Sequence, residues 1–164
     1  MTVEIREARP EEFADAGAVT AEAYREFASG GADWAEYLDE IADVTERAER
    51  TTIVIAIDDG RVVGSATLEL DGRTDADARP LDADEAHIRM LGVHPDARGG
   101  GVATRIMAEC EDRARRAGRS RMTLHTAQNM RAARRMYESL GYERSEDRVF
   151  PDGFVLLGYT KRLD

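Results

Sequence analysis

The chain has 164 residues, 42% of them hydrophobic and 34% charged; this balance predicts one globular domain over residues 1–164 and excludes a disordered or collagen-like chain. The net charge of −10 argues against a nucleic-acid partner and suits a small cationic substrate, unless it serves only to keep the protein in solution. The one cysteine, Cys110, excludes an internal disulfide framework and a cysteine-based zinc site.

The start of the chain and its hydropathy indicate where the protein works. The alternation of residues 1–6, MTVEIR, is typical of a strand rather than of a signal peptide. No apolar run approaches the roughly 20 residues that a membrane span requires. We therefore expect a cytoplasmic protein with no membrane partner.

The first part of the chain predicts a strand and two helices. Alternating apolar residues predict a strand over 3–7. A proline followed by two acids opens a predicted helix over 10–27, which the glycines of segment 29–31 end. Asp33 is expected to cap a second helix, whose apolar face spans residues 34–48.

A hairpin and an acidic loop are predicted next. β-Branched residues indicate a strand over 51–57, and the Asp-Asp-Gly-Arg turn at 58–61 indicates a hairpin with a return strand over 62–70. Residues 71–85 are acidic and poor in apolar side chains. They form either a mobile surface loop or the rim of a site.

The second half of the chain alternates between strands and helices. Hydrophobic periodicity and glycine or proline stops delimit these elements. The predicted strands are 86–93, 122–125, 142–148 and 154–159, and the predicted helices are 102–117 and 130–140. Cys110 lies on the apolar face of the first of these helices and is predicted to be a core residue.

The most informative segment is the turn between strand 86–93 and helix 102–117, which holds three consecutive glycines, 99–101. A helix start offers unpaired N–H groups and a partial positive charge, and glycines remove the Cβ atoms that would keep a ligand away. Arg98 adds a fixed positive charge. The turn therefore predicts an anion cradle, most simply for a pyrophosphate; the alternative is a glycine-rich turn without a ligand.

Two stretches resemble the recurring motifs of the GNAT (GCN5-related N-acetyltransferase) family. Residues 98–103 match its Gln/Arg-x-x-Gly-x-Gly/Ala signature, after a strand ending, 91–95, of the family type. Residues 133–142, A-x-x-x-Y-E-x-L-G-Y, resemble its second block. The resemblance implies an α+β fold of three α/β/α layers, with a mixed, mostly antiparallel sheet that splays at its central strands.

The same resemblance implies an acyl-CoA site, with acetyl-CoA as the acyl donor and no metal. A pantetheine arm resembles a peptide and adds to an open strand edge, while main-chain amides hold the pyrophosphate. The implied pantetheine residues are Leu91, Gly92 and Val93, and the implied pyrophosphate residues are Arg98, Gly99, Gly100, Gly101, Val102, Ala103 and Thr104. A cofactor-binding asparagine of many relatives falls on Met130 here, so its neighbour Asn129 becomes the candidate.

Direct attack by an amine on a thioester requires an acid, an oxyanion donor and a base. The resemblance places the hydroxyl of Tyr137 near the thioester sulfur, as general acid, although this residue also suits the core face of an amphipathic helix. It assigns the oxyanion to the backbone N–H of Val93.

The general base stays open between several groups. By the resemblance the base position falls on His87, and Glu85 lies on the same face of the strand. His125, at the end of the next strand, and water are the alternatives, and any of these side chains could instead be structural. Strict alternation would place His87 and Val93 on one face and Met90 on the other.

The acceptor is the least determined part of the prediction. The resemblance places Asp33, Trp34 and Tyr37 where acceptor contacts arise, but the two aromatics fit better as core. We predict an N-acetyltransferase that moves an acetyl group to the primary amine of a small cationic molecule, as a monomer or homodimer. The alternatives are a protein N-terminal or lysine acetyltransferase and a non-catalytic acyl-CoA-binding regulatory module.

Overall fold

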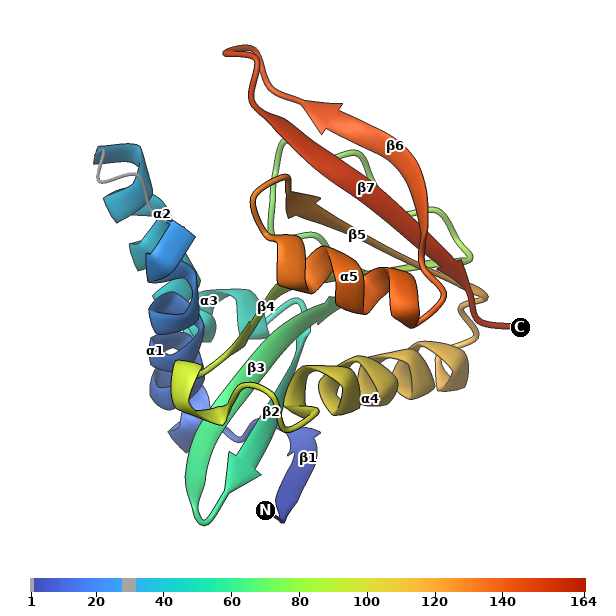
Figure 1. Cartoon of the computed structure of the whole chain (residues 1–164). Coiled ribbons are helices and arrows are strands. Elements are labelled where there is room, and N and C mark those ends of the chain that lie inside the picture. The colour runs from blue at the N-terminus through green and yellow to red at the C-terminus, as the bar shows by residue number, and fades with distance from the viewer. Residues whose placement is uncertain (1, 28–31) are drawn as a thin grey trace.

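The structure is a computed structural model that describes residues 2–27 and 32–164 (Figure 1). Within these residues the strands form one sheet, in the order β1-β2-β3-β4-β5-β7-β6. The strands are β1 (Val3–Glu7), β2 (Thr52–Asp58), β3 (Arg61–Glu69), β4 (Glu85–Val93), β5 (Arg121–Ala127), β6 (Glu143–Val149) and β7 (Val155–Arg162). The helices are α1 (Phe13–Tyr24), α2 (Ala32–Ala42), α3 (Val44–Ala48), α4 (Val102–Arg116) and α5 (Arg131–Ser139), with 3₁₀ turns at Pro10–Glu12, Arg25–Phe27 and Pro95–Ala97.

Helices cover both faces of this sheet. α1 packs on β3 and β4 and α3 packs on β2, whereas α4 lies on the opposite face, across β1 to β4 (Figure 1). Neighbouring strands are antiparallel except β4 and β5, which are parallel. The predicted α+β fold of three layers is therefore confirmed. No helix of the described residues is both long and apolar enough to cross a bilayer.

The central strands separate along their length. β4 and β5 pair only from Glu85 opposite Arg121 to Ile88 opposite Leu124. Beyond this point β5 continues beside β7 as far as Ala127, while β4 stays with β3. The sheet is therefore splayed between β4 and β5, as the resemblance implied.

The predicted helix over 34–48 is in fact two helices, α2 and α3, with a break at Asp43. The buried side chain of Arg47 folds back and donates to three carbonyls at the end of α2, at 2.7 to 3.1 Å. A helix end leaves carbonyls without helical partners, and Arg47 supplies donors to those of Ile41 and Asp43 and a further donor to that of Glu40, which also accepts from the N–H of Asp43, so Arg47 stabilises the break. Asp33 lies inside α2, which already includes residue 32, so the prediction that it caps this helix is wrong. The predicted break at 29–31 lies outside the described residues.

A bulge in β4 changes the alternation of its side chains. Met90 has a φ of 56°, and the pairing register with β3 slips at this point. Ile88 and Val93 consequently share the core on the α4 face, whereas Met90 packs against α1 and α2. The prediction that His87 and Val93 share one face is wrong, because the extra residue reverses the pattern beyond the bulge.

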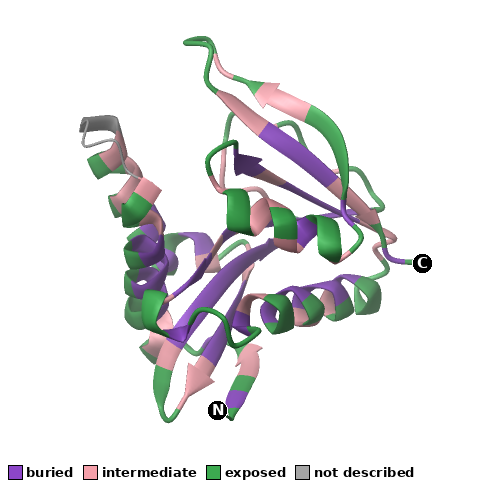
Figure 2. Cartoon of the chain, viewed as in Figure 1, coloured by how far each residue is buried: buried purple, intermediate pink, exposed green. Residues whose placement is uncertain are grey.

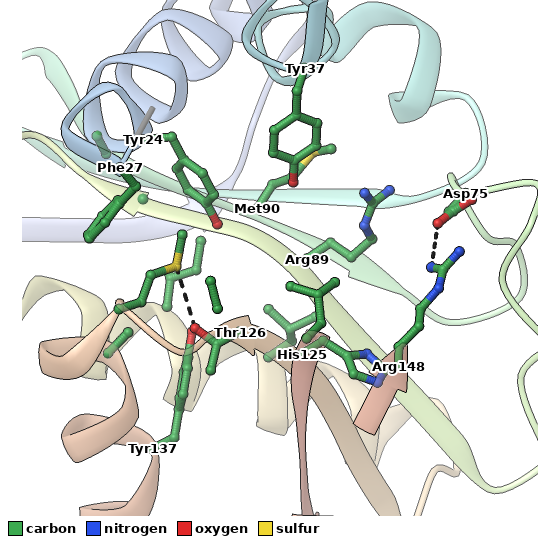
Figure 3. Close-up of a pocket in the computed structure, with 18 of the residues that line it drawn as sticks. Tyr24, Phe27, Tyr37, Asp75, Arg89, Met90, His125, Thr126, Tyr137 and Arg148 are labelled. Atoms are coloured by element: carbon green, nitrogen blue, oxygen red, sulfur yellow. Dashed lines mark hydrogen bonds and ion pairs between the residues drawn. The ribbon is translucent and has the colours of Figure 1, made fainter. Parts of the chain in front are cut away.

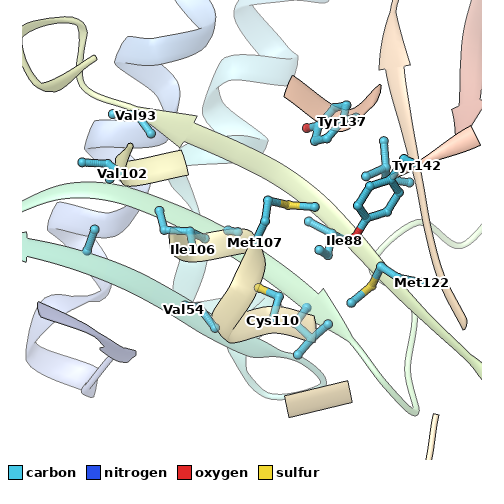
Figure 4. Packing of buried hydrophobic residues seen from close by; sticks show 14 of the residues in the cluster. Val54, Ile88, Val93, Val102, Ile106, Met107, Cys110, Met122, Tyr137 and Tyr142 are labelled. Carbon is cyan, nitrogen blue, oxygen red and sulfur yellow. The ribbon is translucent and has the colours of Figure 1, made fainter. Parts of the chain in front are cut away.

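The main core lies between the sheet and α4. Val102, Ile106, Met107 and Cys110 pack against apolar side chains of the central strands (Figure 4). Cys110 is fully buried, as predicted, and burial raises the pKa of its thiol to about 12. Figure 2 shows that burial concentrates on the central strands and the inner faces of α1 and α4, while α5 and β6 are largely exposed.

Candidate active site

A cavity of about 1090 Å³ lies between β4 and β5, where their pairing has ended (Figure 3). One wall comes from α1 and α2, and the other comes from α5, the end of β5 and the β6–β7 hairpin. Its aromatic lining consists of Tyr24, Phe27, Trp34, Tyr37, Tyr137, Phe150 and Phe154. Its charged lining consists of Glu26, Glu40, Asp75, Asp77 and Asp152 with Arg73, Arg89, Arg98 and Arg148. A concave site of this size, with apolar walls and a few polar groups, suits a small-molecule ligand.

The acidic loop after β3 forms part of the rim of this cavity. Three of its side chains line the cavity. Arg73, near one end, lies 3.1 Å from the buried Glu69, and Arg79, near the other end, lies 2.8 Å from the buried Glu85. Of the two alternatives that the sequence left for this loop, the structure supports the rim of a site.

A second cavity, of about 200 Å³, lies at the glycine-rich turn before α4. Gly99 and Gly101 have φ of 86° and 79°, a left-handed conformation that favours glycine, and a Cβ at either would meet no atom within 4 Å. The first helical hydrogen bond of α4 is donated by Arg105 to Gly101, at 3.0 Å, so the three N–H groups before it have no helical acceptor. Six of the predicted pyrophosphate residues line this cavity, namely Arg98, Gly99, Gly101, Val102, Ala103 and Thr104; Gly100 lies among them on the exposed turn.

Arg98 is held by partners within the protein. It forms an ion pair with Glu26, and its guanidinium donates to the carbonyls of Val93 and Ala23, at 3.4 and 3.3 Å. These contacts tie the glycine-rich turn to the end of α1. The donors that the turn leaves for an anion are therefore mainly its backbone amides.

The strand end predicted to hold pantetheine forms one wall of the large cavity. Leu91, Gly92 and Val93 all line it. The N–H of His94 donates to Val63 on the β3 side, at 2.8 Å, so the N–H of Val93 points to the other edge, where β5 has diverged. Val93 therefore offers a backbone donor toward the cavity.

Tyr137 projects from α5 into the same cavity (Figure 3). Its side chain is largely buried, with its ring 6.0 and 6.1 Å from those of Tyr142 and Tyr159, and burial raises the pKa of its hydroxyl well above the usual value. Among the described residues the hydroxyl has no hydrogen-bond partner; the dashed line beside it in Figure 3 joins Thr126 to Met130. Tyr137 therefore carries a proton that is free to be donated into the cavity.

His87 also lines the cavity, and its Nδ1 belongs to a buried chain of hydrogen bonds. Its Nδ1 lies 2.7 Å from the hydroxyl of Thr123, which in turn lies 2.6 Å from Glu85 Oε2. Burial acts to raise the pKa of Glu85, but hydrogen bonds from Arg79 and Thr123 outweigh this and lower it to about 2. A carboxylate only accepts, so Thr123 donates to Glu85 and accepts from His87 Nδ1–H. His87 Nε2 is therefore the unprotonated nitrogen and an available base.

Of the remaining predicted site residues, His125 lines the cavity, whereas Glu85 and Asn129 do not. Glu85 is fully buried behind His87 and does not line the cavity. Asn129 is exposed and also off the cavity, whereas its neighbour Met130 lines it. His125 lines the cavity with its ring 5.5 Å from that of His87, and burial lowers the pKa of both imidazoles.

The acceptor side of the cavity contains the two aromatics that the sequence analysis favoured as core residues, and two arginines that it did not single out. Trp34 and Tyr37 both line the cavity, and their ring centroids lie 5.8 Å apart. Tyr37 also packs against the small core cluster beneath α2. Arg89 and Arg148 line the same region. Arg89 carried a usable signal, because an arginine inside a largely buried strand is rarely there without a partner or a ligand.

Solved structures of acetyltransferases share this fold. The yncA protein of Salmonella typhimurium, solved with its cofactor acetyl-CoA, is 20% identical and has a TM-score of 0.71 over 100% of this chain and 95% of its own. The paia N-acetyltransferase of Thermoplasma acidophilum, solved with coenzyme A, is 15% identical with a TM-score of 0.75 over 99% of both chains. These likenesses show that the chain has the same fold as these two proteins.

Sequence comparison specifies the family. The acetyltransferase (GNAT) family model matches residues 14–142. The Xenopus tropicalis protein named probable N-acetyltransferase camello is 32% identical over 104 residues, which are 63% of this chain and 44% of that relative. The matched segment thus spans less than half of the camello protein. The chain belongs to the GNAT family of acetyltransferases, which confirms the resemblance drawn from its two motifs.

Proposed function

We propose that the protein transfers the acetyl group of acetyl-CoA to the primary amine of a small acceptor, by direct attack in a ternary complex. The observation that carries this proposal is that the two cavities adjoin: Val93, Arg98, Ala103 and Met136 line both. One ligand can therefore place an anionic group on the glycine-rich turn and an extended arm between β4 and β5. Acetyl-CoA has this shape, and the Salmonella and Thermoplasma relatives were solved with acetyl-CoA and coenzyme A.

In this proposal the cofactor is held mainly by backbone. The amides of residues 99–104 bind the pyrophosphate, and the open edge of 91–93 pairs with the pantetheine amides. Met130 lies on the cavity wall where the arm would pass. We assign no contact in the cleft to Asn129, because it is exposed.

The chemistry is assigned to three groups. His87 Nε2 accepts a proton from the acceptor ammonium, directly or through water, and the amine nitrogen attacks the thioester carbon. The N–H of Val93 stabilises the oxyanion. As the carbon–sulfur bond breaks, the Tyr137 hydroxyl protonates the departing thiolate. The nitrogen then loses its surplus proton, which returns to the Tyr137 oxygen directly or through water, and His87 releases its proton to solvent. Glu85 acts as a positioning residue, because it reaches the reaction only through Thr123 and His87.

A screen of primary amines against acetyl-CoA, following thiol release, tests the proposed activity. With any accepted amine, Tyr137→Phe should lower kcat by about 100-fold or more, because the thiolate loses its proton donor. Acetyl-CoA affinity measured by calorimetry should not change, because the substitution removes only the hydroxyl.

Tyr142→Phe is the matched control. It also removes a buried hydroxyl, which donates to Glu111 at 2.8 Å, but Tyr142 does not line the cavity. It should lower stability and leave turnover intact. Acetyl-CoA binding without turnover of any amine would favour the regulatory-module alternative, and turnover of peptides alone would favour a protein acetyltransferase.

A further inference from the structure

The positive charges on the cavity wall are almost all balanced by carboxylates of the protein. Four arginines line the cavity, and three of them form ion pairs with carboxylates. The three pairs are Arg73 with Glu69, Arg98 with Glu26 and Arg148 with Asp75. Within the described residues, Glu40, Asp77 and Asp152 of the wall form no ion pair, so the wall presents free negative charges as well as arginines.

Arg89 is the exception among the arginines of this wall. Within the described residues it forms no ion pair; its Nη1 donates to the hydroxyl of Thr74, and the phenol of Tyr37 is a second polar neighbour. A guanidinium carries five N–H groups, so most of its donors stay available. The side chain projects into the cavity between Tyr37 and the Arg148–Asp75 pair (Figure 3). Arg89 thus presents an unbalanced positive charge to a ligand.

The position of Arg89 relates this charge to the proposed reaction. It lies two residues after His87, before the bulge, so both side chains leave β4 on the same face, roughly 7 Å apart along the strand. An amine at His87 and an anion at Arg89 would therefore be separated by only a few bonds. The phenol of Tyr37 and the indole of Trp34 lie on the wall beside them and suit an apolar side chain.

We propose that the acceptor is a primary amine that also bears a carboxylate a few bonds from the nitrogen, and that Arg89 binds this carboxylate. The inference rests on the proposed acetyl transfer and specifies its substrate class. A planar guanidinium matches a carboxylate through two parallel hydrogen bonds. Such a zwitterion keeps the cationic amine expected from the sequence and also supplies an anion for Arg89.

The test compares acceptors that differ only at the carboxyl group. Amino acids with aromatic and aliphatic side chains, their carboxamides and their decarboxylated amines are assayed with acetyl-CoA on the wild type, Arg89→Gln and Arg89→Lys. Arg89→Gln should lower kcat/KM for the amino acids by about 100-fold, since it removes one partner of an enclosed charge pair, and for the carboxamides by less than about 3-fold. Arg89→Lys should recover part of the loss. Arg61→Gln, at an exposed position in the β2–β3 hairpin, is the matched control and should change neither value.

The possible outcomes separate this inference from the proposed activity. If Arg89→Gln lowers kcat/KM equally for acids, amides and amines, or if the wild type prefers the amides, the carboxylate site is wrong while acetyl transfer stands. If no amine is acetylated, calorimetric binding of N-acetyl amino acids decides: binding that is lost in Arg89→Gln supports the site, and equal or absent binding overturns it. Thermal melting checks that the variant folds; if it does not, the wild type's preference for acids over amides decides.

Discussion

Thr123 is the residue on which the chemistry of His87 depends. Its hydroxyl connects the imidazole to the Glu85 carboxylate, so His87 is held in one tautomer with Nε2 toward the cavity. A neighbouring carboxylate also favours positive charge on the ring when it takes a proton. Thr123 carries no motif, because its role arises only when β5 pairs with β4.

Removing this hydroxyl should impair the base and spare the cofactor site. We expect Thr123→Val to lower kcat by at least about 10-fold, since the tautomer of His87 is no longer fixed. Acetyl-CoA affinity should be unchanged. Thr123→Ser, which keeps the hydroxyl, should retain most of the activity. A Thr123→Val enzyme as fast as the wild type at every pH would exclude His87 as the base.

At the level of elements, the start of α4 is the part that the cofactor proposal needs most. Its turn has two glycines with positive φ and open space around them, next to helix N–H groups that lack partners. The β4 bulge is the second important feature, because it changes the face that the strand's side chains occupy: Ile88 and Val93 join the core with α4, and Met90 packs toward α1 and α2.

A methyl group added to this turn should weaken acetyl-CoA binding by more than its effect on the stability of the fold explains. Gly101→Ala places a Cβ in the cradle and a left-handed alanine in the backbone, so we expect acetyl-CoA to bind at least about 10-fold more weakly and the protein to lose about 1 kcal/mol of stability. Calorimetry and thermal melting measure the two effects. Gly118→Ala, at the other end of α4 with a φ of 82°, has the same strain outside the cradle. Gly118→Ala should lower the melting temperature as much as Gly101→Ala does, without changing the affinity for acetyl-CoA. If both variants lost acetyl-CoA affinity equally, the turn would not contact the cofactor.

On the scale of the whole molecule, ion pairs to two buried carboxylates attach the rim loop to the sheet. Glu69 and Glu85 are fully buried, and each accepts hydrogen bonds from an arginine of the loop and from a loop backbone N–H. The loop therefore shares the stability of the fold, and the acceptor wall that it carries is positioned before a ligand binds.

Acid should weaken this attachment. The pKa of Glu85 is about 2 in the folded protein and 4.5 ordinarily, so its stabilising effect is present above pH 4.5 and is lost as the pH falls through about 2. Glu85→Gln should therefore cost about 2 kcal/mol at pH 7, where Arg79 loses its partner. The difference from the wild type in urea unfolding should shrink steadily between pH 4.5 and pH 2. A difference that stays constant over this range would show that the carboxylate charge contributes nothing.

Much of the fold and part of the site could be predicted from the sequence. The hairpin at 58–61 was predictable because its turn requires positive φ, which Asp59 and Gly60 adopt at 50° and 78°. The break between α2 and α3 was not, because a side chain from the following helix, Arg47, stabilises it. The tautomer of His87 was equally beyond reach, since its partners come from two strands.

The sequence by itself determined the elements, their order and the glycine-rich turn, because periodicity, turn chemistry and helix starts depend on residues close together in the chain. Only the tertiary structure decided which side chains meet in the cavity. The β4 bulge reversed a face, the splay of β4 from β5 opened the space, and ion pairs across the chain neutralised every arginine of the described cavity wall except Arg89. Apart from the pair of Arg73 with Glu69, four residues away, these ion pairs and the strand pairing join residues far apart in the chain, and a local pattern carries no record of them.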